Sequence, residues 1–271
     1  MPELPEVETV KNTLKKLVLN KKIFDVNVIY SNIIEYPNVE EFRKNIINQT
    51  IIDIKRRGKW LMFELNNYYL LSHLRMEGKY IIRNKDDKID KHEHVEFIFD
   101  DNTTLRYKDT RKFGRMYLYK KEDVYDNKPL NELGLEPWDK NLNIEYLKEK
   151  FKNKKLPIKT LLLDQSIMVG LGNIYVDEVL FMSHLNPKTK VTSLTNNNLK
   201  DIIKNSRIVL EHAIQLGGTT IRSYESSEGV HGLFQNELLV HGKEICPNCN
   251  QKIEKIRVGG RGTYYCPNCQ K

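Results

Sequence analysis

The chain has 271 residues, of which 39% are hydrophobic and 30% are charged, and its formal net charge is +8. This length suffices for one large or two ordinary domains with a substantial core. The excess of positive charge points to an acidic partner, either nucleic acid or a membrane surface. No apolar run approaches the roughly 20 residues of a membrane-spanning helix, and no signal peptide opens the chain. We therefore exclude a membrane-spanning protein and expect a cytoplasmic location.

The first residues carry the clearest candidate for chemistry. Removal of Met1 would expose Pro2 as a secondary amine, and an α-amino group titrates near ~7.7–8.0, well below the ~10.4 of lysine. A neutral amine can attack an electrophilic carbon and form an iminium. Glu3, one peptide bond away, can move a proton during that attack. The alternative is that Pro2 only favours methionine removal, and that Glu3 and Glu6 form the acidic first turn of a helix.

The apolar spacing after this terminus predicts a helix over residues 5–19, which would restrict the motion of Pro2. Short β-rich runs then follow one another at 23–30, 51–55, 60–65, 68–74, 80–83, 95–99, 104–107 and 116–119. Such a series predicts a β-sandwich or flattened barrel. Residues 39–47 interrupt it as a predicted short helix, and the charged stretch 84–91 predicts an exposed hairpin loop.

Three places in this β-rich region stand out. Lys59 follows a basic turn, Arg56-Arg57-Gly58, at the start of an apolar strand. Met76 lies between Arg75 and Glu77, which favours an exposed loop tip over the core packing that is usual for methionine. Phe113 follows Arg111 and Lys112 and precedes a glycine, an unusual setting for a buried aromatic.

A pair of histidines nearby has two interpretations. His92 and His94 project together from a strand and could hold a metal, but no third ligand lies near them in the sequence. We therefore favour a role without metal for both.

Past residue 126 the pattern turns helical, with helices predicted at 129–133, 144–151, 158–164, from Asn173 onward and at 198–216. Gly170 and Gly172 precede Asn173, which predicts an exposed helix N-terminus with free amides that can bind phosphate. Asn173 could equally be a helix N-cap. Lys155 lies at a basic corner. The polar, glycine-dotted stretch 217–235 is long enough to be a recognition loop or lid.

The tail carries the four cysteines, as Cys246-Pro-Asn-Cys249 and Cys266-Pro-Asn-Cys269. This spacing is typical of a four-cysteine zinc ribbon, with a β-hairpin turning at Gly259-Gly260. Because thiolates fill all four positions, the predicted Zn²⁺ is structural. The tail from 238 to 271 also carries six Lys/Arg and two Glu, half of the net positive charge.

The opening string MPELPEVET resembles the start of the formamidopyrimidine-DNA glycosylase family, bacterial enzymes that excise oxidised purines from DNA. The strings TRKFG and GLGNIYVDE and the cysteine ribbon extend the resemblance over essentially the whole chain. It implies the catalytic residues Pro2, Glu3, Glu6, Lys59 and Arg261. It also implies DNA contacts by His73, Met76, His92, Arg111, Phe113, Lys155, Asn173 and Arg261.

Individual roles follow from the same resemblance. Met76 and Phe113 would fill the space left by an extruded base, and Arg111 would contact the orphaned partner base, replacing part of the lost stacking and pairing. Lys59 would lie near the sugar, and Arg261 would contact the backbone beside the lesion. The loop 217–235 would close over the flipped base.

The sequence thus predicts an α+β multidomain protein: a catalytic β-sandwich domain at 1–126, a helix-two-turns-helix domain at 127–237 and a zinc ribbon at 238–271. We expect a monomeric, bifunctional DNA glycosylase and AP lyase that acts on double-stranded DNA with oxidised bases or abasic sites. One structural Zn²⁺ is expected, with no redox or organic cofactor. Two alternatives stay open: an endonuclease-VIII-like enzyme for oxidised pyrimidines, and a zinc-ribbon nucleic-acid-binding protein without catalysis.

Overall fold

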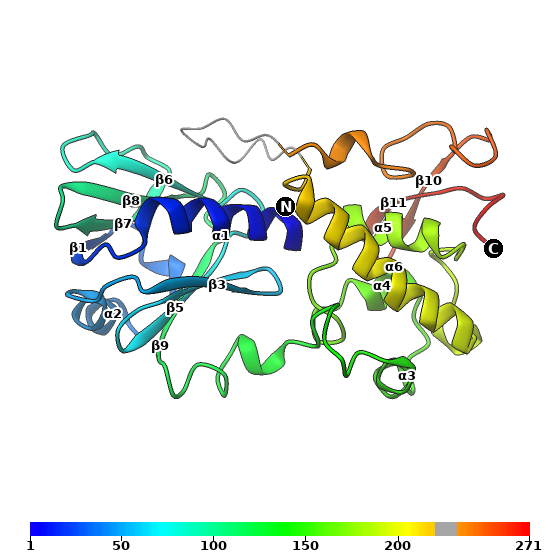
Figure 1. Cartoon of the computed structure of the whole chain (residues 1–271), viewed down its shortest axis with the longest axis horizontal. Helices are drawn as coiled ribbons and strands as arrows, with labels where there is room; N and C mark the ends of the chain where they lie inside the picture. Colours follow the sequence, from blue (N-terminus) through cyan, green and yellow to red (C-terminus); the bar gives the residue numbers. More distant parts are fainter. Residues whose placement is uncertain (220–231) are drawn as a thin grey trace. The chain divides into compact units, whose positions relative to one another are not determined.

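The computed structural model describes residues 1–219 and 232–271. The described chain divides into two compact units (Figure 1). The first contains residues 1–2 and 6–131, and the second contains 3–5, 132–219 and 232–271. Apart from residues 127–131, the described residues of the predicted helical region and of the ribbon belong to the second unit. The finer boundaries at 126/127 and 237/238 stay a prediction, and residues 220–231 of the predicted recognition loop lie outside the described chain.

The first unit is built on two β-sheets. Its strands are β1 (Ile23–Val28), β2 (Ile34–Tyr36), β3 (Asp53–Arg57), β4 (Trp60–Glu64), β5 (Tyr68–His73), β6 (Lys79–Asn84), β7 (Glu93–Phe99), β8 (Thr103–Lys108) and β9 (Arg115–Lys120). One sheet has the order β1-β7-β8-β6 and the other β2-β9-β5-β4-β3. Among the strands described in this unit, only β2 and β9 pair in parallel. Buried side chains from both sheets form one core, which confirms the predicted sandwich.

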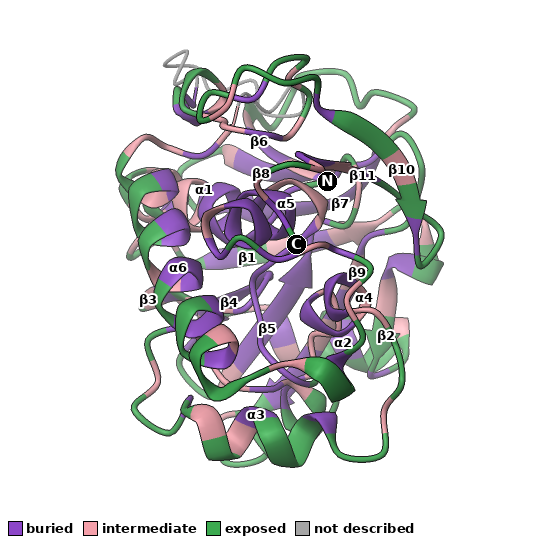
Figure 2. Ribbon diagram, turned by 90° about the vertical axis from the view of Figure 1, so that its right-hand side faces the viewer, coloured by how far each residue is buried: buried purple, intermediate pink, exposed green. Residues whose placement is uncertain are grey.

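Helix α1 (Leu4–Val18) closes this core with Val7, Val10, Leu14 and Val18, all at most 2% exposed. These residues recur at three- and four-residue spacing, so one face of the helix is apolar and packs against the sheets. The short helix α2 (Val39–Ile46) buries Phe42 and Ile46 in the same core. Strands β4 and β5 are buried almost throughout (Figure 2), which explains why their sequences do not alternate.

The predicted hairpin loop at 84–91 is exposed, but it is not a hairpin. It joins β6 to β7, and β8 lies between these two strands in the sheet. The connection therefore crosses β8, and the fully buried Arg106 of β8 binds it. The Arg106 guanidinium donates to the carbonyls of Asn84 (3.3 Å), Asp87 (2.7 Å) and Lys88 (3.2 Å). Its remaining N–H groups contact the carboxylates of Glu93 and Glu96.

The second unit is mainly helical. Its helices are α3 (Ile144–Phe151), α4 (Ile158–Leu162), α5 (Asn173–Met182) and α6 (Asn196–Gln215). At the boundary between the units, a 3-10 turn (Leu130–Glu132) replaces the helix predicted at 129–133. Helix α5 is the buried centre: seven of its ten residues are buried (Figure 2). Thr195 caps α6 by accepting the N–H of Asn198. No helix of the described residues is long and apolar enough to span a membrane.

The C-terminal hairpin, β10 (Glu254–Val258) and β11 (Arg261–Tyr265), turns at Gly259 and Gly260 as predicted. Both glycines have positive φ, +55° and +78°, the combination that a tight two-residue hairpin turn requires. Arg261 is therefore the first residue after the turn.

Candidate catalytic groups and nucleic-acid interface

The exposed Met1 is followed by two buried residues, Pro2 and Glu3, before α1 starts at Leu4. Glu6, in the first turn of α1, is also buried, with 2% of its surface exposed. The backbone N–H of Leu4 donates to the carbonyl of Gly170 (3.2 Å), so the first helical residue is tied to the segment before α5.

Glu3 caps helix α5. Its carboxylate accepts the backbone N–H groups of Gly172 (2.6 Å), Ile174 (2.9 Å) and Tyr175 (3.4 Å). Glu3 therefore occupies amides that were expected to be free, whereas a phosphate contact by Asn173 stays a prediction. N–H donors and the positive end of a helix dipole favour a negative charge, so this setting suits an ionised Glu3.

Asn173 is not the N-cap of α5, since Gly172 holds that position. Its side-chain amide instead donates to the carbonyl of Gly262 (2.9 Å), the residue after Arg261. Its Oδ1 is buried and has no hydrogen-bond partner among the described residues. Within the second unit, the structure thus connects Glu3, Asn173 and the exposed Arg261 through α5, although these residues are far apart in the sequence.

A buried ion pair also binds the β10–β11 hairpin. Lys159 of α4 and Asp177 of α5 are fully buried, and their charged atoms are 2.7 Å apart. Lys159 also donates to the carbonyl of Gly262 (3.2 Å) and to Thr263 Oγ1 (2.8 Å), while Asp177 contacts His241 Nδ1 (2.8 Å). Burial lowers the pKa of Lys159, and the Asp177 charge opposes that effect.

Replacing Lys159 by methionine should destabilise the second unit by about 3–5 kcal/mol, because it leaves the Asp177 charge buried without its main partner. Urea unfolding can be followed by the fluorescence of Trp138 in a Trp60→Phe background, since the chain has two tryptophans. Lys152→Met is the matched control, because Lys152 and Glu149 pair at 3.7 Å with side chains 65% and 75% exposed. Such a pair contributes only about 0–1 kcal/mol. Equal stability of the two variants would contradict a structural role for the buried pair.

In the first unit, Lys59 lies in the two-residue turn between β3 and β4, where Arg57 pairs with Trp60. It is only 6% exposed, unusual for a hairpin lysine. In the preceding basic segment, Arg56 binds Glu8 of α1 (2.8 Å) and the carbonyl of Gly58 (3.0 Å). This ion pair fixes the hairpin that carries Lys59 to the helix that follows Pro2.

His73, at the end of β5, is 8% exposed and packs edge-on against Trp60, with ring centroids 4.7 Å apart. Its Nδ1 accepts the backbone N–H of Arg75 (2.9 Å), which orients the turn before Met76. Burial, and then the charges of Arg75 and Lys59, lower the pKa of His73 to about 3. The imidazole is therefore neutral at physiological pH, and a direct contact of His73 with DNA stays a prediction.

This depressed pKa of His73 predicts a loss of stability in mild acid. The unfolded chain takes up a proton near pH 6.5, whereas the folded chain does so only near pH 3. Between these values, stability falls with decreasing pH by up to about 1.4 kcal/mol per pH unit from this one group. From pH 6.5 to 5 the loss is about 1.6 kcal/mol.

His73→Asn should remove this slope, since asparagine offers an acceptor near the Nδ1 position but does not titrate. Trp60 fluorescence in a Trp138→Phe background reports unfolding of this unit. The same slope in both proteins between pH 6.5 and 5 would show that His73 titrates normally.

The two loops with predicted wedge residues both lie in the first unit. Met76 is half-buried in the turn between β5 and β6, and Phe113 is 45% exposed in the loop between β8 and β9. The Arg111 guanidinium lies over the Phe113 ring, 4.7 Å from its centroid. This exposed, cation-stacked aromatic fits the prediction of a loop that faces a ligand.

The structure does not support a metal site formed by His92 and His94. His94 is buried and its Nε2 contacts the carbonyl of Asp109 (2.7 Å), whereas His92 is half-buried. Among the described residues, the cysteines are the only group that could hold a metal ion. Lys155 is exposed before α4, as expected for a backbone contact that stays a prediction.

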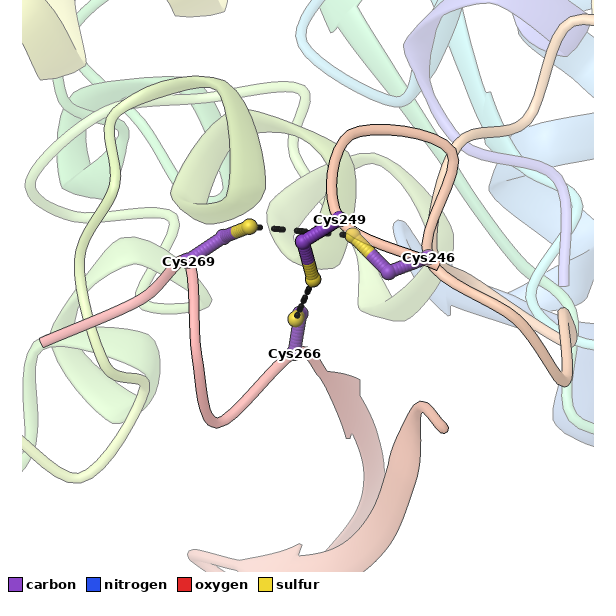
Figure 3. Close-up of side chains that lie close together, drawn as sticks. All are labelled: Cys246, Cys249, Cys266 and Cys269. Atoms are coloured by element: carbon purple, nitrogen blue, oxygen red, sulfur yellow. Dashed lines mark hydrogen bonds between the residues drawn. The ribbon is translucent and has the colours of Figure 1, made fainter. Parts of the chain in front are cut away.

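The four cysteines converge at the base of the ribbon (Figure 3). The sulfurs of Cys246 and Cys269 are 3.7 Å apart, those of Cys249 and Cys266 are 3.5 Å apart, and all four lie within 4.8 Å of one another. A tetrahedral Zn²⁺ with Zn–S bonds of about 2.3 Å needs sulfur separations of about 3.8 Å. The donor set and its spacing therefore fit one structural metal ion.

Several residues that organise these sites were not predicted. Lys159 lies among apolar neighbours in α4, and Asp177 and Glu178 interrupt the apolar run of α5. A charge in such a run is the available sequence signal for a buried ion pair. Glu178 accepts the backbone N–H groups of Leu239, Val240 and His241, so it fixes the segment that leads into the ribbon.

Comparison with known proteins agrees with these features. Residues 1–116 match the Formamidopyrimidine-DNA glycosylase N-terminal domain, residues 133–225 the Formamidopyrimidine-DNA glycosylase H2TH domain, and residues 243–271 the Zinc finger found in FPG and IleRS. The chain is 48% identical to the formamidopyrimidine-DNA glycosylase of Oceanobacillus iheyensis, covering 100% of this chain and 98% of that protein. It is 47% identical to the Bacillus subtilis enzyme, covering 100% and 99%.

Solved structures give the same result. The chain resembles Lactococcus lactis Fpg in a complex with DNA containing an abasic site, with a TM-score of 0.92, 38% identity and 100% coverage of both chains. A variant of that enzyme bound to Fapy-dG-containing DNA matches with the same TM-score, identity and coverage. The fold and site thus define the class, a DNA glycosylase of base excision repair. The chain belongs to the formamidopyrimidine-DNA glycosylase family, whose members are glycosylases and AP lyases.

Proposed function

We propose that this enzyme excises oxidised purines from double-stranded DNA and then cleaves the strand, with the nitrogen of Pro2 as the nucleophile. The observation that carries the proposal is the anchoring of Glu3 on the N-terminus of α5. Hydrogen bonds to the residue directly after Pro2 restrict the motion of a chain end that would otherwise fray. A restrained nucleophile avoids an ordering cost at each turnover.

The proposed reaction begins when the Pro2 nitrogen, freed by removal of Met1, attacks C1′ of the damaged nucleotide. The bond from C1′ to the base breaks, and the base leaves with the electron pair. The amine loses a proton as the new bond forms. An ionised Glu3 can accept that proton and return it to the sugar oxygen or to the leaving base.

Opening of the sugar ring then gives an iminium between Pro2 and C1′, which acidifies the neighbouring C2′ position. Loss of a C2′ proton expels the 3′ phosphate, and loss of a C4′ proton expels the 5′ phosphate. Hydrolysis with water releases the sugar remnant and regenerates the amine. We assign Lys59 and Arg261 to proton transfer and phosphate binding in these eliminations, and count Glu6 among the supporting groups. The near-complete burial of Lys59 and the bonded hairpin under Arg261 support these roles.

We further propose that His92, Lys155, Asn173 and Arg261 contact the DNA backbone, while Met76, Arg111 and Phe113 fill the space of the extruded base. The DNA in the matched Lactococcus lactis complexes carries an abasic site or Fapy-dG, which supports damaged duplex DNA as the partner. The metal bound by the cysteines is proposed to be Zn²⁺, on the basis of its four-thiolate set. Action as a monomer and a cytoplasmic location stay predictions.

A panel of duplexes with single lesions tests this function. We expect single-turnover excision of 8-oxoguanine and formamidopyrimidines to exceed that of oxidised pyrimidines, with phosphates at both ends of the resulting gap. Faster excision of oxidised pyrimidines would favour the endonuclease-VIII-like alternative. Binding of all duplexes without any cleavage would favour the non-catalytic alternative.

A further inference from the structure

Asp109, a buried carboxylate at the end of β8, has no assigned role in the reaction. It is 1% exposed, and it is bonded to the loop 110–114 at several points. Its Oδ1 accepts the N–H of Arg111 (3.0 Å), and its Oδ2 accepts the N–H groups of Phe113 (2.8 Å) and Gly114 (2.8 Å). The loop is therefore folded around one carboxylate.

The backbone of Asp109 is held as firmly as its side chain. Its N–H donates to the carbonyl of His92 (2.9 Å), and its carbonyl contacts His94 Nε2 (2.7 Å). The N–H of Lys112 also bonds to that carbonyl (3.3 Å). Asp109 thus connects the loop 110–114 to the end of the crossover that carries His92.

Tyr107, two residues earlier on β8, extends this arrangement to the turn that carries Met76. Its hydroxyl donates to Asp109 Oδ2 (3.4 Å) and fills the space beside Gly78 and Gly114. A Cβ atom at Gly78 would lie 2.2 Å from this hydroxyl, and one at Gly114 would lie 1.8 Å from it. The phenol therefore packs directly against the backbone of both loops, which the absence of side chains at these glycines permits.

We propose that Asp109, supported by Tyr107, is a positioning residue that sets the geometry of the two DNA-inserting loops, 74–78 and 110–114. This inference rests on the proposed function, because that function requires the two loops to insert side chains into the DNA. Extruding a base costs a few kcal/mol, which inserted side chains recover only if they enter the stack in the right place. Loops already fixed by hydrogen bonds do not have to be ordered on binding.

A carboxylate is required at this position because two oxygens serve three backbone N–H donors. Asparagine has nearly the same shape but offers one oxygen, and its amide N–H₂ would face a donor. Asp109→Asn should therefore loosen the loop while changing the volume of the core very little. Asp101→Asn is the matched control, since Asp101 also accepts a backbone N–H, from Thr103 (3.0 Å), in the turn between β7 and β8 of the same sheet.

The test compares two substrates under single-turnover conditions: 8-oxoguanine paired with cytosine, and an abasic site in the same duplex. An abasic site has no base to unpair or unstack, so it depends less on insertion. For Asp109→Asn we expect excision of 8-oxoguanine to fall roughly tenfold or more relative to cleavage of the abasic site. A variant that only lost folded protein would slow both reactions equally. Tyr107→Phe should shift the ratio in the same direction by less.

A second readout follows insertion directly. The fluorescence of 2-aminopurine placed beside the lesion should rise on binding of wild-type enzyme and rise less with Asp109→Asn. Borohydride trapping of wild-type enzyme and of Asp101→Asn on the abasic duplex tests the proposed function separately. If these proteins are trapped and Asp109→Asn shows an unchanged ratio of the two rates, with a normal 2-aminopurine signal, the positioning role is overturned.

Discussion

An uncleaved extension before Pro2 should abolish both base excision and strand cleavage, because it keeps the Pro2 nitrogen in a peptide bond without a reactive lone pair. Removal of a covalent nucleophile costs on the order of 10⁴-fold or more in rate. Binding to a duplex with a stable abasic analogue should change far less, since the proposed DNA contacts are made by other residues. Single-turnover excision and equilibrium binding, measured on the same preparation, separate these two effects.

Pro2→Gly gives the graded comparison. After methionine removal it keeps a free but primary amine, so iminium chemistry remains possible at reduced efficiency. We expect slower excision of intact lesions, a smaller loss on abasic sites and nearly unchanged binding. Full activity of the extended protein, with its extension shown intact by mass spectrometry, would exclude Pro2 as the nucleophile.

Loss of the metal is the second change with a large expected effect. In zinc-finger peptides a structural zinc contributes about 10–16 kcal/mol, and that energy stabilises the folded state. Cys249→Ser should therefore reduce bound zinc from one ion per chain to none and unfold the ribbon. Because the hairpin presents Arg261, we expect DNA affinity to fall roughly 10- to 100-fold, which corresponds to about 1.4–2.8 kcal/mol.

Gln251→Ala is the control for this prediction, because Gln251 is exposed in the same knuckle and contributes no thiol. It should keep its zinc, measured by elemental analysis, and its affinity for DNA. Unchanged DNA binding by zinc-free protein would show that the ribbon does not contribute to the interface.

Local sequence patterns were sufficient for much of the fold. Three patterns are each formed by residues close together in the sequence: the apolar face of α1, the short β-rich runs and the CxxC knuckles. The structure confirms all three. The ends of elements were less accurate, and β2 was not predicted, because a three-residue edge strand carries little pattern of its own.

The errors concern interactions between residues that are distant in the sequence. The backbone N–H groups of Gly172, Ile174 and Tyr175 were expected to be free because no nearby residue could bind them. The distant Glu3 nevertheless accepts all three, from 171 residues away in the case of Ile174. The stretch 84–91 was predicted as an exposed hairpin loop because it is charged, whereas it crosses β8 and its carbonyls bind Arg106. Buried charged groups of this kind are paired through the tertiary fold, which periodicity does not describe.

The candidate site residues also divide into those marked by a local pattern and those that act through distant contacts. Pro2, Lys59, Arg111, Phe113 and the cysteines could be selected from local context. Asp109, Lys159 and Asp177 could not, because each acts by holding other residues rather than by facing solvent. Their roles can be inferred only from the hydrogen bonds that they make in the folded chain.

The most direct test of the central claim is the site of covalent attachment to DNA. Borohydride reduction during cleavage of an abasic or 8-oxoguanine duplex should join enzyme and sugar, and mass spectrometry of the digested adduct should identify the modified residue. We predict a modified N-terminal peptide that starts at Pro2 and lacks Met1. Attachment at Lys59 or another lysine, or robust cleavage without any trapped adduct, would contradict the account.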